Sequence, residues 1–285
     1  MSGKGCLSRV GQLVNARFPY LPTMHNTPQV VWITGASTGI GEALAYEYAR
    51  RGARLVLSAR NQAALEKVAA ACAPAETLVL PLDLAQPANF PAAVGRVWAH
   101  FGRLDILLNN GGISQRSLAL ETGLEVDRRL MEVNYFGTVA LTKAVLPHLL
   151  QQGAGQVVVV SSLVGKFGTP YRSAYAASKH ALHGFFDSLR AELAGTGLGV
   201  TILCPGFIRT GVSVNALTGD GTPLGEMDEA TAKGLAPADL ARQAARAIAQ
   251  GRHEVYIGGR ETWGVLLKRL APGLFTRFLS RAKVR

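Results

Sequence analysis

The sequence predicts an α/β protein built on a doubly wound, Rossmann-type parallel sheet of about seven strands with helices on both faces. Two observations support this fold class. From residue 30 onward, short apolar runs alternate with amphipathic segments of about ten to twenty residues, which is typical of βαβ units around a buried sheet. A glycine-rich turn also joins the first apolar run to the first amphipathic segment, where glycines let the backbone turn sharply.

The apolar runs define the expected strands in chain order. They are Val30–Thr34, Arg54–Ala59, Thr77–Leu80, Ile106–Asn109, Gln156–Ser161, Val200–Cys204 and Glu254–Ile257. Most of the segments between them are predicted to be helices, the first over Glu42–Arg50. Because βαβ crossovers are right-handed, such units place helices on both faces of one sheet. Ligands of these sheets bind at the carboxyl ends of the strands, near the point where the strand order reverses.

Composition excludes several classes of protein. The chain has 285 residues, of which 48% are hydrophobic and 17% charged, which is the composition of a globular protein. No apolar run approaches the roughly 18 residues of a membrane span, and the basic start of the chain lacks the apolar stretch of a secretory signal. We therefore expect a cytoplasmic protein. The cysteines, Cys6, Cys72 and Cys204, are too few and too far apart for a disulfide framework or a metal knuckle.

The net charge of +11 lies mostly at the two ends of the chain. Residues 1–29 contribute +3 and residues 252–285 contribute +6, which leaves +2 for everything between them. A nucleic-acid groove in the body of the protein is therefore not expected, since such a groove needs a concentration of basic residues.

The chain is predicted to have three parts: a flexible leader over residues 1–27, a single Rossmann-type catalytic domain over residues 28–258 and a basic amphipathic extension over residues 259–285. Within the domain, residues 207–235 are rich in glycine and weakly periodic. They predict a lid-like insertion, with an ordinary surface loop as the alternative. The extension is expected either to pack as a helix pair on the body or a partner subunit, or to contact an anionic membrane peripherally.

The turn after the first strand reads Thr34-Gly35-Ala36-Ser37-Thr38-Gly39-Ile40-Gly41. Its glycines allow a ligand to approach the backbone, and the helix N-terminus that follows offers N–H groups to a pyrophosphate. At the end of the second strand, Arg60 and Asn61 stand where an acidic residue would bind a ribose 2′-hydroxyl. Because an arginine there accommodates a 2′-phosphate, NADP(H) is the expected cofactor, with NAD(H) as the alternative.

A second group of residues has the chemistry of a proton-transfer site. Tyr175 and Lys179 are four residues apart and share one face of a predicted helix. A free phenol, with a pKa of about 10, is a poor catalyst at neutral pH, and a neighbouring ammonium lowers that pKa. Ser162 follows the fifth strand and would lie beside them. Asn134 lies within a predicted helix, where asparagine is unfavourable, which suggests that it has a role other than folding.

These motifs resemble the short-chain dehydrogenase/reductase family over about residues 28–258. The matching elements occur in the family's order, and they are Thr34-Gly35-x-x-x-Gly39-x-Gly41, Asp83, Asn109-Asn110-Gly111-Gly112, Asn134, Ser162, Tyr175-x-x-x-Lys179 and Pro205-Gly206 with Thr210. One position departs from the family pattern, because Gly111 stands where alanine is common.

The resemblance implies hydride transfer between a nicotinamide and a ketone or secondary alcohol. Tyr175 would be the general acid/base, Lys179 would lower its pKa and bind the nicotinamide ribose, Ser162 would position the carbonyl, and Asn134 would order a water for proton relay. The cofactor-binding residues it implies are Gly35, Ser37, Thr38, Gly39, Ile40, Gly41, Arg60, Asn61, Asp83, Leu84, Asn109, Tyr175, Lys179, Pro205, Gly206, Ile208 and Thr210.

The expected function is therefore NADP(H)-dependent oxidation or reduction of a lipophilic alcohol or ketone, such as a steroid or retinoid, by a homodimer or homotetramer. The alternatives are a 3-oxoacyl thioester reductase and a non-catalytic cofactor-binding or membrane-attached module. No metal site is expected, because His180 and His183 lie one helical turn apart without further ligands nearby in the sequence.

Overall fold

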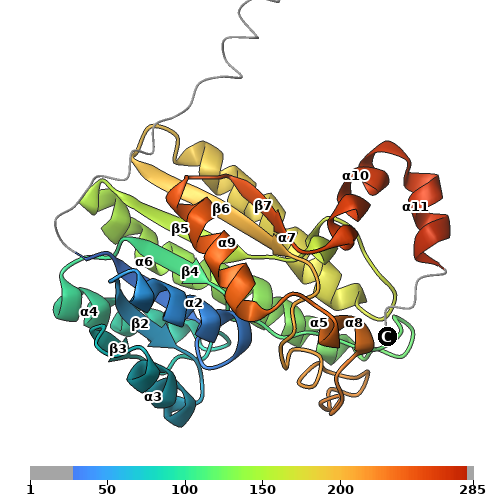
Figure 1. Ribbon diagram of the computed structural model, residues 1–285, viewed down its shortest axis with the longest axis horizontal. Coiled ribbons are helices and arrows are strands. Elements are labelled where there is room, and N and C mark those ends of the chain that lie inside the picture. Colours follow the sequence, from blue (N-terminus) through green and yellow to red (C-terminus); the bar gives the residue numbers. More distant parts are fainter. Residues whose placement is uncertain (1–27, 281–285) are drawn as a thin grey trace, which may run out of the picture.

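The computed structural model describes residues 28–280, so the expected leader and residues 281–285 of the extension lie outside the described range. One parallel sheet with the strand order β3-β2-β1-β4-β5-β6-β7 forms the centre (Figure 1). Its strands are β1 (Val30–Thr34), β2 (Arg54–Ser58), β3 (Thr77–Val79), β4 (Ile106–Asn109), β5 (Gly155–Val160), β6 (Leu198–Pro205) and β7 (Glu254–Ile257). All the expected strands are present, within two residues of their predicted ends, and the predicted fold class is confirmed.

Helices cover both faces of the sheet (Figure 1). One apolar core joins the sheet to α2 (Gly39–Arg50), α3 (Gln62–Ala71) and α9 (Pro237–Ala249), and the other joins it to α4 (Phe90–Phe101), α6 (Thr138–Gln152) and α7 (Ser173–Glu192). Strand β1 shows why the sheet has an apolar core on each face, because alternate side chains of a strand point to opposite faces. Val31 and Ile33 belong to the first core, while Val30 and Trp32 belong to the second.

Burial on both faces explains why the strands lack an alternating pattern. Every residue of β5 is buried, as expected for a parallel strand covered by helices above and below. Polar side chains within the sheet are hydrogen-bonded, since the indole nitrogen of Trp32 donates to Ser58 Oγ at 2.9 Å and Gln156 Nε2 donates to Thr201 Oγ1 at 2.8 Å.

The remaining elements surround the carboxyl ends of the strands. They are α5 (Leu124–Met131), the π-helix η2 (Glu132–Gly137), α8 (Glu229–Ala232), α10 (Trp263–Leu270), α11 (Pro272–Leu279) and the 3₁₀ turns η1 (Pro87–Asn89), η3 (Leu163–Gly165) and η4 (Arg260–Thr262). The strand order reverses between β1 and β4, so the glycine turn after β1 lies at the switch point.

The basic extension forms the helix pair α10 and α11, which projects from one side of the body (Figure 1). Phe275 is its buried anchor and packs edge-on against Phe167, with ring centroids 5.0 Å apart. Glu261 ties the start of the pair to the end of β6, because its Oε1 accepts from the backbone N–H of Phe207 at 3.2 Å. No helix among residues 28–280 is both long and apolar enough to cross a membrane.

Candidate active site

A cavity of about 1610 Å³ runs along the carboxyl edge of the sheet. Ordinary ligand pockets measure about 300–1,000 Å³, so this one has room for a dinucleotide and a substrate together. The predicted site residues that line it are Gly35, Ser37, Thr38, Gly39, Ile40, Arg60, Asn61, Asp83, Leu84, Ser162, Tyr175, Lys179, Pro205, Gly206, Ile208 and Thr210. The fold thus gathers residues from the ends of several strands around one space.

The glycine turn is shaped as a cradle. Gly35 and Gly39 have φ angles of +64° and +63°, in the left-handed region that other residues adopt only with strain. Gly41 is required for space, because a Cβ there would lie 2.1 Å from the carbonyl oxygen of Gly35. Asn110 braces the turn by donating its Nδ2 to the carbonyl oxygens of Thr34 at 3.0 Å and Gly35 at 3.2 Å. The turn therefore fits the phosphates of a dinucleotide, which would approach the backbone and the N-terminus of α2.

Three of the predicted site residues, Gly41, Asn109 and Asn134, do not line the cavity, and the roles expected of them stay predictions. Gly41 lies behind the turn. Asn109 is buried, and its Nδ2 donates to Thr142 Oγ1 of α6 at 3.1 Å because side chains alternate direction at the end of β4. Asn110 stands at the cavity in its place, and Asn134 is fully buried.

The nitrogen and the oxygen of the Asn134 side-chain amide both form hydrogen bonds within the protein. Its Nδ2 donates to the carbonyl oxygen of Ile113 and to Ser178 Oγ, each at 2.9 Å, and its Oδ1 accepts from the N–H of Ile113 at 2.8 Å. Ser178 Oγ in turn donates to the carbonyl oxygen of Tyr175 at 2.8 Å. Asn134 therefore ties the chain after β4 to α7 and positions the catalytic helix, while the expected ordering of a water stays a prediction.

Arg60 is exposed and lies in the turn that follows β2. Asn61 caps α3, with its Oδ1 accepting from the N–H of Ala64 at 3.0 Å, and Asp83 Oδ1 accepts from the N–H of Ala85 at 3.0 Å. No hydrogen bond or ion pair joins the Arg60 guanidinium to another residue between 28 and 280. Its charge is available to a ligand in the cavity.

Ser162, Tyr175 and Lys179 meet on the cavity wall. Ser162 hydrogen-bonds the Tyr175 hydroxyl. The Nζ of Lys179 lies 5.8 Å from the centre of the Tyr175 ring and donates to the carbonyl oxygen of Val160 at 2.9 Å. Burial lowers the pKa of Lys179 to about 8, which brings this ammonium closer to giving up its proton at neutral pH.

The pKa of Tyr175 is raised, because burial outweighs the charges and hydrogen bond that stabilise the phenolate. The opposing influences come from Arg116, then from the hydrogen bond with Ser162, then from Arg172. The hydroxyl therefore keeps its proton at neutral pH and is suited to donate it to a carbonyl oxygen. Sequence reasoning assigned this electrostatic role to Lys179 and missed both arginines, although the position of Arg172 three residues before Tyr175 was a usable signal.

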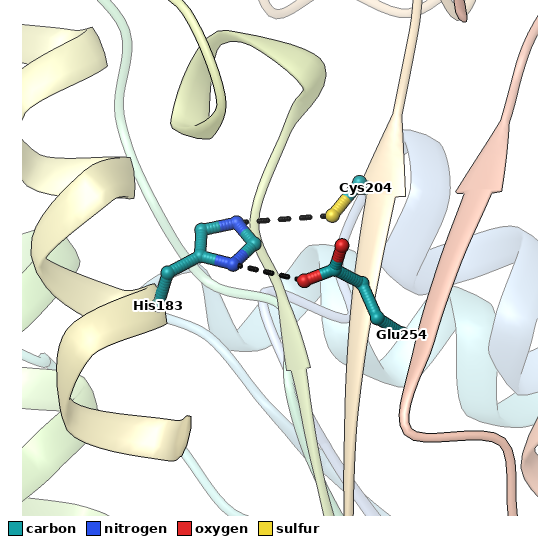
Figure 2. A group of neighbouring side chains, drawn as sticks. All are labelled: His183, Cys204 and Glu254. Atoms are coloured by element: carbon teal, nitrogen blue, oxygen red, sulfur yellow. Dashed lines mark hydrogen bonds and ion pairs between the residues drawn. The ribbon is translucent and has the colours of Figure 1, made fainter. Parts of the chain in front are cut away.

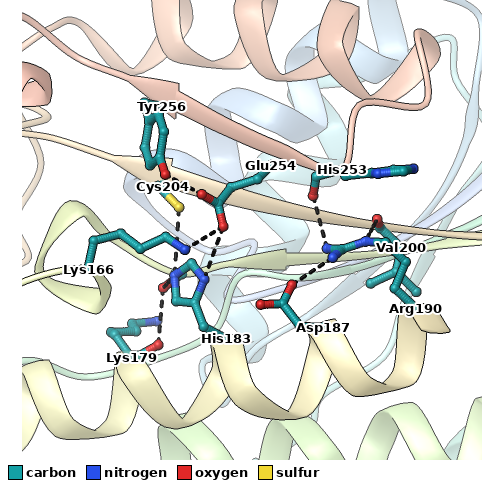
Figure 3. A network of polar contacts seen from close by, with 11 residues as sticks. Lys166, Lys179, His183, Asp187, Arg190, Val200, Cys204, His253, Glu254 and Tyr256 are labelled. Carbon is teal, nitrogen blue, oxygen red and sulfur yellow. Dashed lines mark hydrogen bonds and ion pairs between the residues drawn. The ribbon is translucent and has the colours of Figure 1, made fainter. Parts of the chain in front are cut away.

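The sequence also did not predict a polar cluster that lies between α7 and the strands β6 and β7 (Figure 2). His183, one turn after Lys179, has its Nε2 3.0 Å from Ser161 Oγ and 3.8 Å from Cys204 Sγ, and its Nδ1 3.3 Å from Glu254 Oε2. These side chains are of metal-ligand type, but the Nζ of Lys166 already pairs with Glu254 Oε2 at 2.6 Å (Figure 3). The cluster joins the turn that bears Ser162, the helix α7 and the strand β7.

Replacing Glu254 with glutamine is expected to lower the free energy of unfolding at neutral pH by about 1–3 kcal/mol. Burial alone would raise the pKa of Glu254, but hydrogen bonds from His183, Lys166 and Tyr256 lower it from 4.5 to about 2. A depressed folded-state pKa contributes stability above pH 4.5 that is lost as the pH falls toward 2. Urea unfolding at a series of pH values should therefore show the wild-type advantage shrinking over that window.

The matched control for this measurement is Asp187→Asn, on the exposed side of α7, the helix that carries His183 (Figure 3). Asp187 pairs with Arg190 at 2.6 Å and its side chain is 52% exposed, so its loss should change the unfolding free energy by less than about 1 kcal/mol. Equal effects of the two variants at every pH would contradict a special role for Glu254.

Comparison with known proteins agrees with this geometry. The family model described as short chain dehydrogenase matches residues 29–220. A Drosophila melanogaster protein, dehydrogenase/reductase SDR family protein 7-like, is 44% identical over 264 residues, covering 90% of this chain and 81% of that protein. Dehydrogenase/reductase SDR family member 7B of Bos taurus is also 44% identical over 264 residues, covering 89% of this chain and 81% of its own length.

Solved structures share the fold. A short chain dehydrogenase/reductase from Burkholderia phymatum in complex with NAD superposes with a TM-score of 0.78 at 26% identity, covering 87% of this chain and 95% of that one. An alcohol dehydrogenase from Thermococcus sibiricus complexed with 5-hydroxy-NADP superposes with a TM-score of 0.69 at 28% identity, covering 82% of this chain and 97% of that one.

Proposed function

Because the chain belongs to the short-chain dehydrogenase/reductase family, we propose that it is an NADP(H)-dependent oxidoreductase acting on a lipophilic ketone or secondary alcohol. The observation that carries this proposal is the meeting of Ser162, Tyr175 and Lys179 in a cavity that continues to the glycine turn. The steroid and retinoid carbonyls named from the resemblance are the first substrates to test.

The protein's own residues supply the proton and the orientation of the substrate. A bound nicotinamide supplies or accepts the hydride. Ser162 Oγ, which lies 3.4 Å from the carbonyl oxygen of Pro205 and accepts from the N–H of Val164 at 3.3 Å, holds the substrate oxygen beside the phenol. Tyr175 gives that oxygen its proton in reduction and takes it back in oxidation. Lys179, inside the wall, would bind the ribose, while Arg116 and Arg172 supply the positive charge that favours the phenolate of Tyr175.

The apolar part of the cavity supports a lipophilic substrate. The side chains that form it come largely from the extension, and they are Trp263, Leu266, Leu267, Leu270, Phe275 and Phe278, together with Phe167. Residues of the insertion 207–235 line the same space, which supports a lid over the substrate.

The experiment that tests the function is NADPH oxidation by the purified chain against steroid ketones, retinal and 3-oxoacyl thioesters. Turnover with the first two classes supports the proposal. Turnover restricted to thioesters supports the 3-oxoacyl reductase instead, and tight cofactor binding without any turnover supports a non-catalytic module.

Replacing Arg60 with aspartate is expected to reverse the cofactor preference. The exposed guanidinium is replaced by a carboxylate, which repels a 2′-phosphate and accepts a hydrogen bond from a 2′-hydroxyl. The ratio of kcat/KM for NADPH to that for NADH should fall by about 100-fold or more. Arg96→Asp, an equal change of charge on the exposed side of α4, is the control and should leave the ratio unchanged. A wild-type protein that prefers NADH would contradict the assignment.

The outer face of the helix pair supports a peripheral contact between a cytoplasmic enzyme and an anionic membrane. Leu274 of α11 is 60% exposed and does not line the cavity, whereas Trp263, Leu270 and Phe278, which are 71%, 79% and 63% exposed, belong to its lining. Lys268 and Arg269 lie on the same pair of helices, a combination typical of helices that lie on anionic lipid.

Leu274→Glu is expected to weaken binding to phosphatidylserine vesicles by about tenfold or more, because a charged group would enter the lipid interface. Co-sedimentation measures this, and raised salt should weaken the wild-type contact as well. Leu120→Glu is the control, since Leu120 is 99% exposed but lies outside the extension. Absence of wild-type sedimentation would instead favour packing of this face on a partner subunit.

The protein is also proposed to form a homodimer or homotetramer through the helices that hold Asn134 and Tyr175. Exposed apolar side chains on this part of the surface, Phe136 at 52% and Leu150 at 43%, support such an interface. Light scattering on the purified protein measures the mass directly, and a monomer at micromolar concentration would contradict it.

A further inference from the structure

Gln115 lies in a chain segment after β4 that the insertion holds on one side. The N–H of Leu217 donates to the carbonyl oxygen of Ser114, and the N–H of Arg116 donates to the carbonyl oxygen of Leu217, each at 2.8 Å. Nη1 of Arg116 also donates to the carbonyl oxygen of Gln115 at 2.8 Å, while its Nη2 pairs with Asp228 Oδ2 at 2.9 Å. The backbone around Gln115 is therefore fixed.

The side chain of Gln115 points from this segment to the start of α7. Ser114 and Arg116 line the cavity, whereas Gln115 between them does not and is fully buried. Its Oε1 accepts from the backbone N–H of Ala174 at 3.0 Å and from that of Tyr175 at 3.4 Å. One buried oxygen thus binds two of the first N–H groups of the catalytic helix.

The helix has no such cap in its own sequence. It begins at Ser173, and the side chain of the preceding residue, Arg172, makes no capping hydrogen bond. The first N–H groups of a helix lack partners within it, and a polar side chain just before the helix usually accepts from the second or third of them. In α7 these belong to Ala174 and Tyr175. Gln115 supplies the missing acceptor from 59 and 60 positions earlier in the chain.

The amide nitrogen of Gln115 fixes the direction of the oxygen. Nε2 lies 2.7 Å from Thr122 Oγ1, 3.1 Å from Ser117 Oγ, 3.3 Å from the carbonyl oxygen of Ser117 and 3.3 Å from Ser173 Oγ. A backbone carbonyl oxygen only accepts hydrogen bonds and a backbone N–H only donates them. Both ends of the amide are therefore satisfied only when its oxygen faces α7.

We propose that Gln115 is a positioning residue for the proton transfer, which caps α7 and thereby holds Tyr175 beside Ser162. Gln115 binds the backbone N–H of Tyr175, and Ser162 hydrogen-bonds its hydroxyl, so the residue is held at both ends. A misplacement of about 1 Å at a reacting group can slow a reaction about 100-fold. This inference rests on the proposed function, because only a reaction that uses the phenol depends on its position.

Gln115→Leu tests the proposal, because leucine is of similar size but has neither the acceptor nor the donor. The full chain is saturated with NADPH at neutral pH, with whichever of the steroid ketones, retinal and 3-oxoacyl thioesters the wild type reduces fastest. We expect kcat to fall about 10- to 100-fold, with KM and NADPH affinity within about threefold of wild type. Near-ultraviolet circular dichroism establishes that the variant is folded. A general loosening of the cavity would raise KM as well.

Gln115→Glu is the rescue variant. One carboxylate oxygen still accepts from the N–H groups of Ala174 and Tyr175, and the neighbouring hydroxyl groups can turn to donate to the other. We expect kcat for reduction to stay within about fivefold of wild type at neutral pH, where the phenol already carries its proton. A glutamate variant as slow as the leucine variant would overturn the capping role.

Gln152→Leu is the matched control, because Gln152 at the end of α6 makes the same kind of contact elsewhere. Its Nε2 donates to the carbonyl oxygens of Leu104 at 2.8 Å and Ala154 at 2.7 Å, and its Oε1 accepts from the N–H of Leu104 at 3.3 Å. Leu104 and Ala154 precede β4 and β5, at the opposite edge of the sheet from the cavity. This variant should lose thermal stability but keep the wild-type kcat.

The effect of Gln115 must also depend on the phenol. In a Tyr175→Phe background, Gln115→Leu should lower the residual kcat by less than about twofold. An equal loss in both backgrounds would overturn the proposal, and so would an unchanged kcat in Gln115→Leu alone. The proposed function fails separately: a wild-type chain that reduces no carbonyl removes the function and this inference with it, whereas wild-type turnover that Gln115→Leu leaves unaffected removes this inference alone.

Discussion

Replacing Tyr175 with phenylalanine is expected to lower kcat/KM for carbonyl reduction by about a thousandfold, with cofactor affinity within about threefold of wild type. The raised pKa of the phenol keeps a proton ready for the substrate oxygen at neutral pH. Phenylalanine keeps the ring and its packing but has no proton to give. Single-turnover kinetics and a separate titration of NADPH fluorescence distinguish the chemical step from cofactor binding.

Tyr46→Phe is the matched control for this variant. Tyr46 lies on α2, and its hydroxyl bonds only to Glu42 on the same exposed face. The removal of that hydroxyl should leave kcat/KM unchanged. A Tyr175→Phe enzyme that retained more than about a tenth of wild-type turnover would rule out the phenol as the proton donor.

Replacing Gly41 with alanine is expected to weaken cofactor binding by about 100-fold or more and to destabilise the fold by about 1–3 kcal/mol. The new Cβ would lie 2.1 Å from the carbonyl oxygen of Gly35 and 2.6 Å from Nδ2 of Asn110. Neither atom belongs to a flexible end, because Asn110 is bonded to the backbone of the turn at two places. The turn must open, and the N–H groups that face the phosphates then lose their arrangement.

Gly95→Ala provides the comparison, since a Cβ at Gly95 in α4 would meet nothing within 4 Å. Alanine favours a helix by about 0.5–1 kcal/mol over glycine, so this variant should be slightly more stable and should bind cofactor normally. Isothermal titration with NADPH and thermal unfolding report on the two properties. Normal cofactor affinity in Gly41→Ala would show that the turn does not bind the phosphates.

The strands were predictable because their physics is local. A strand such as β5 is buried on both faces, and its four consecutive valines, Val157 to Val160, are typical of such a strand. The catalytic candidates could also be predicted from the sequence, because Tyr175 and Lys179 are neighbours on one helix and Ser162 follows a strand end. The sequence could not show which of the adjacent asparagines, Asn109 and Asn110, faces the cavity, because only the direction of the backbone at the end of the strand decides that.

The residues that sequence reasoning missed act across long separations in the chain. Asp228 and Arg116 are 112 positions apart, and Glu254 reaches His183 from another strand. The charge of each such residue is visible in the sequence, but its partner is not, because the electrostatic effect depends on distance and burial.

By itself, then, the sequence determined the strands and their order, the family and the side chains proposed to transfer a proton. All of these depend on neighbouring residues or on strand ends that one sheet must bring together. The tertiary structure decided which groups set the pKa of Tyr175, which face of the extension closes the cavity and where two buried arginines point. These properties arise from packing between distant segments, and no local pattern encodes the distances on which they depend.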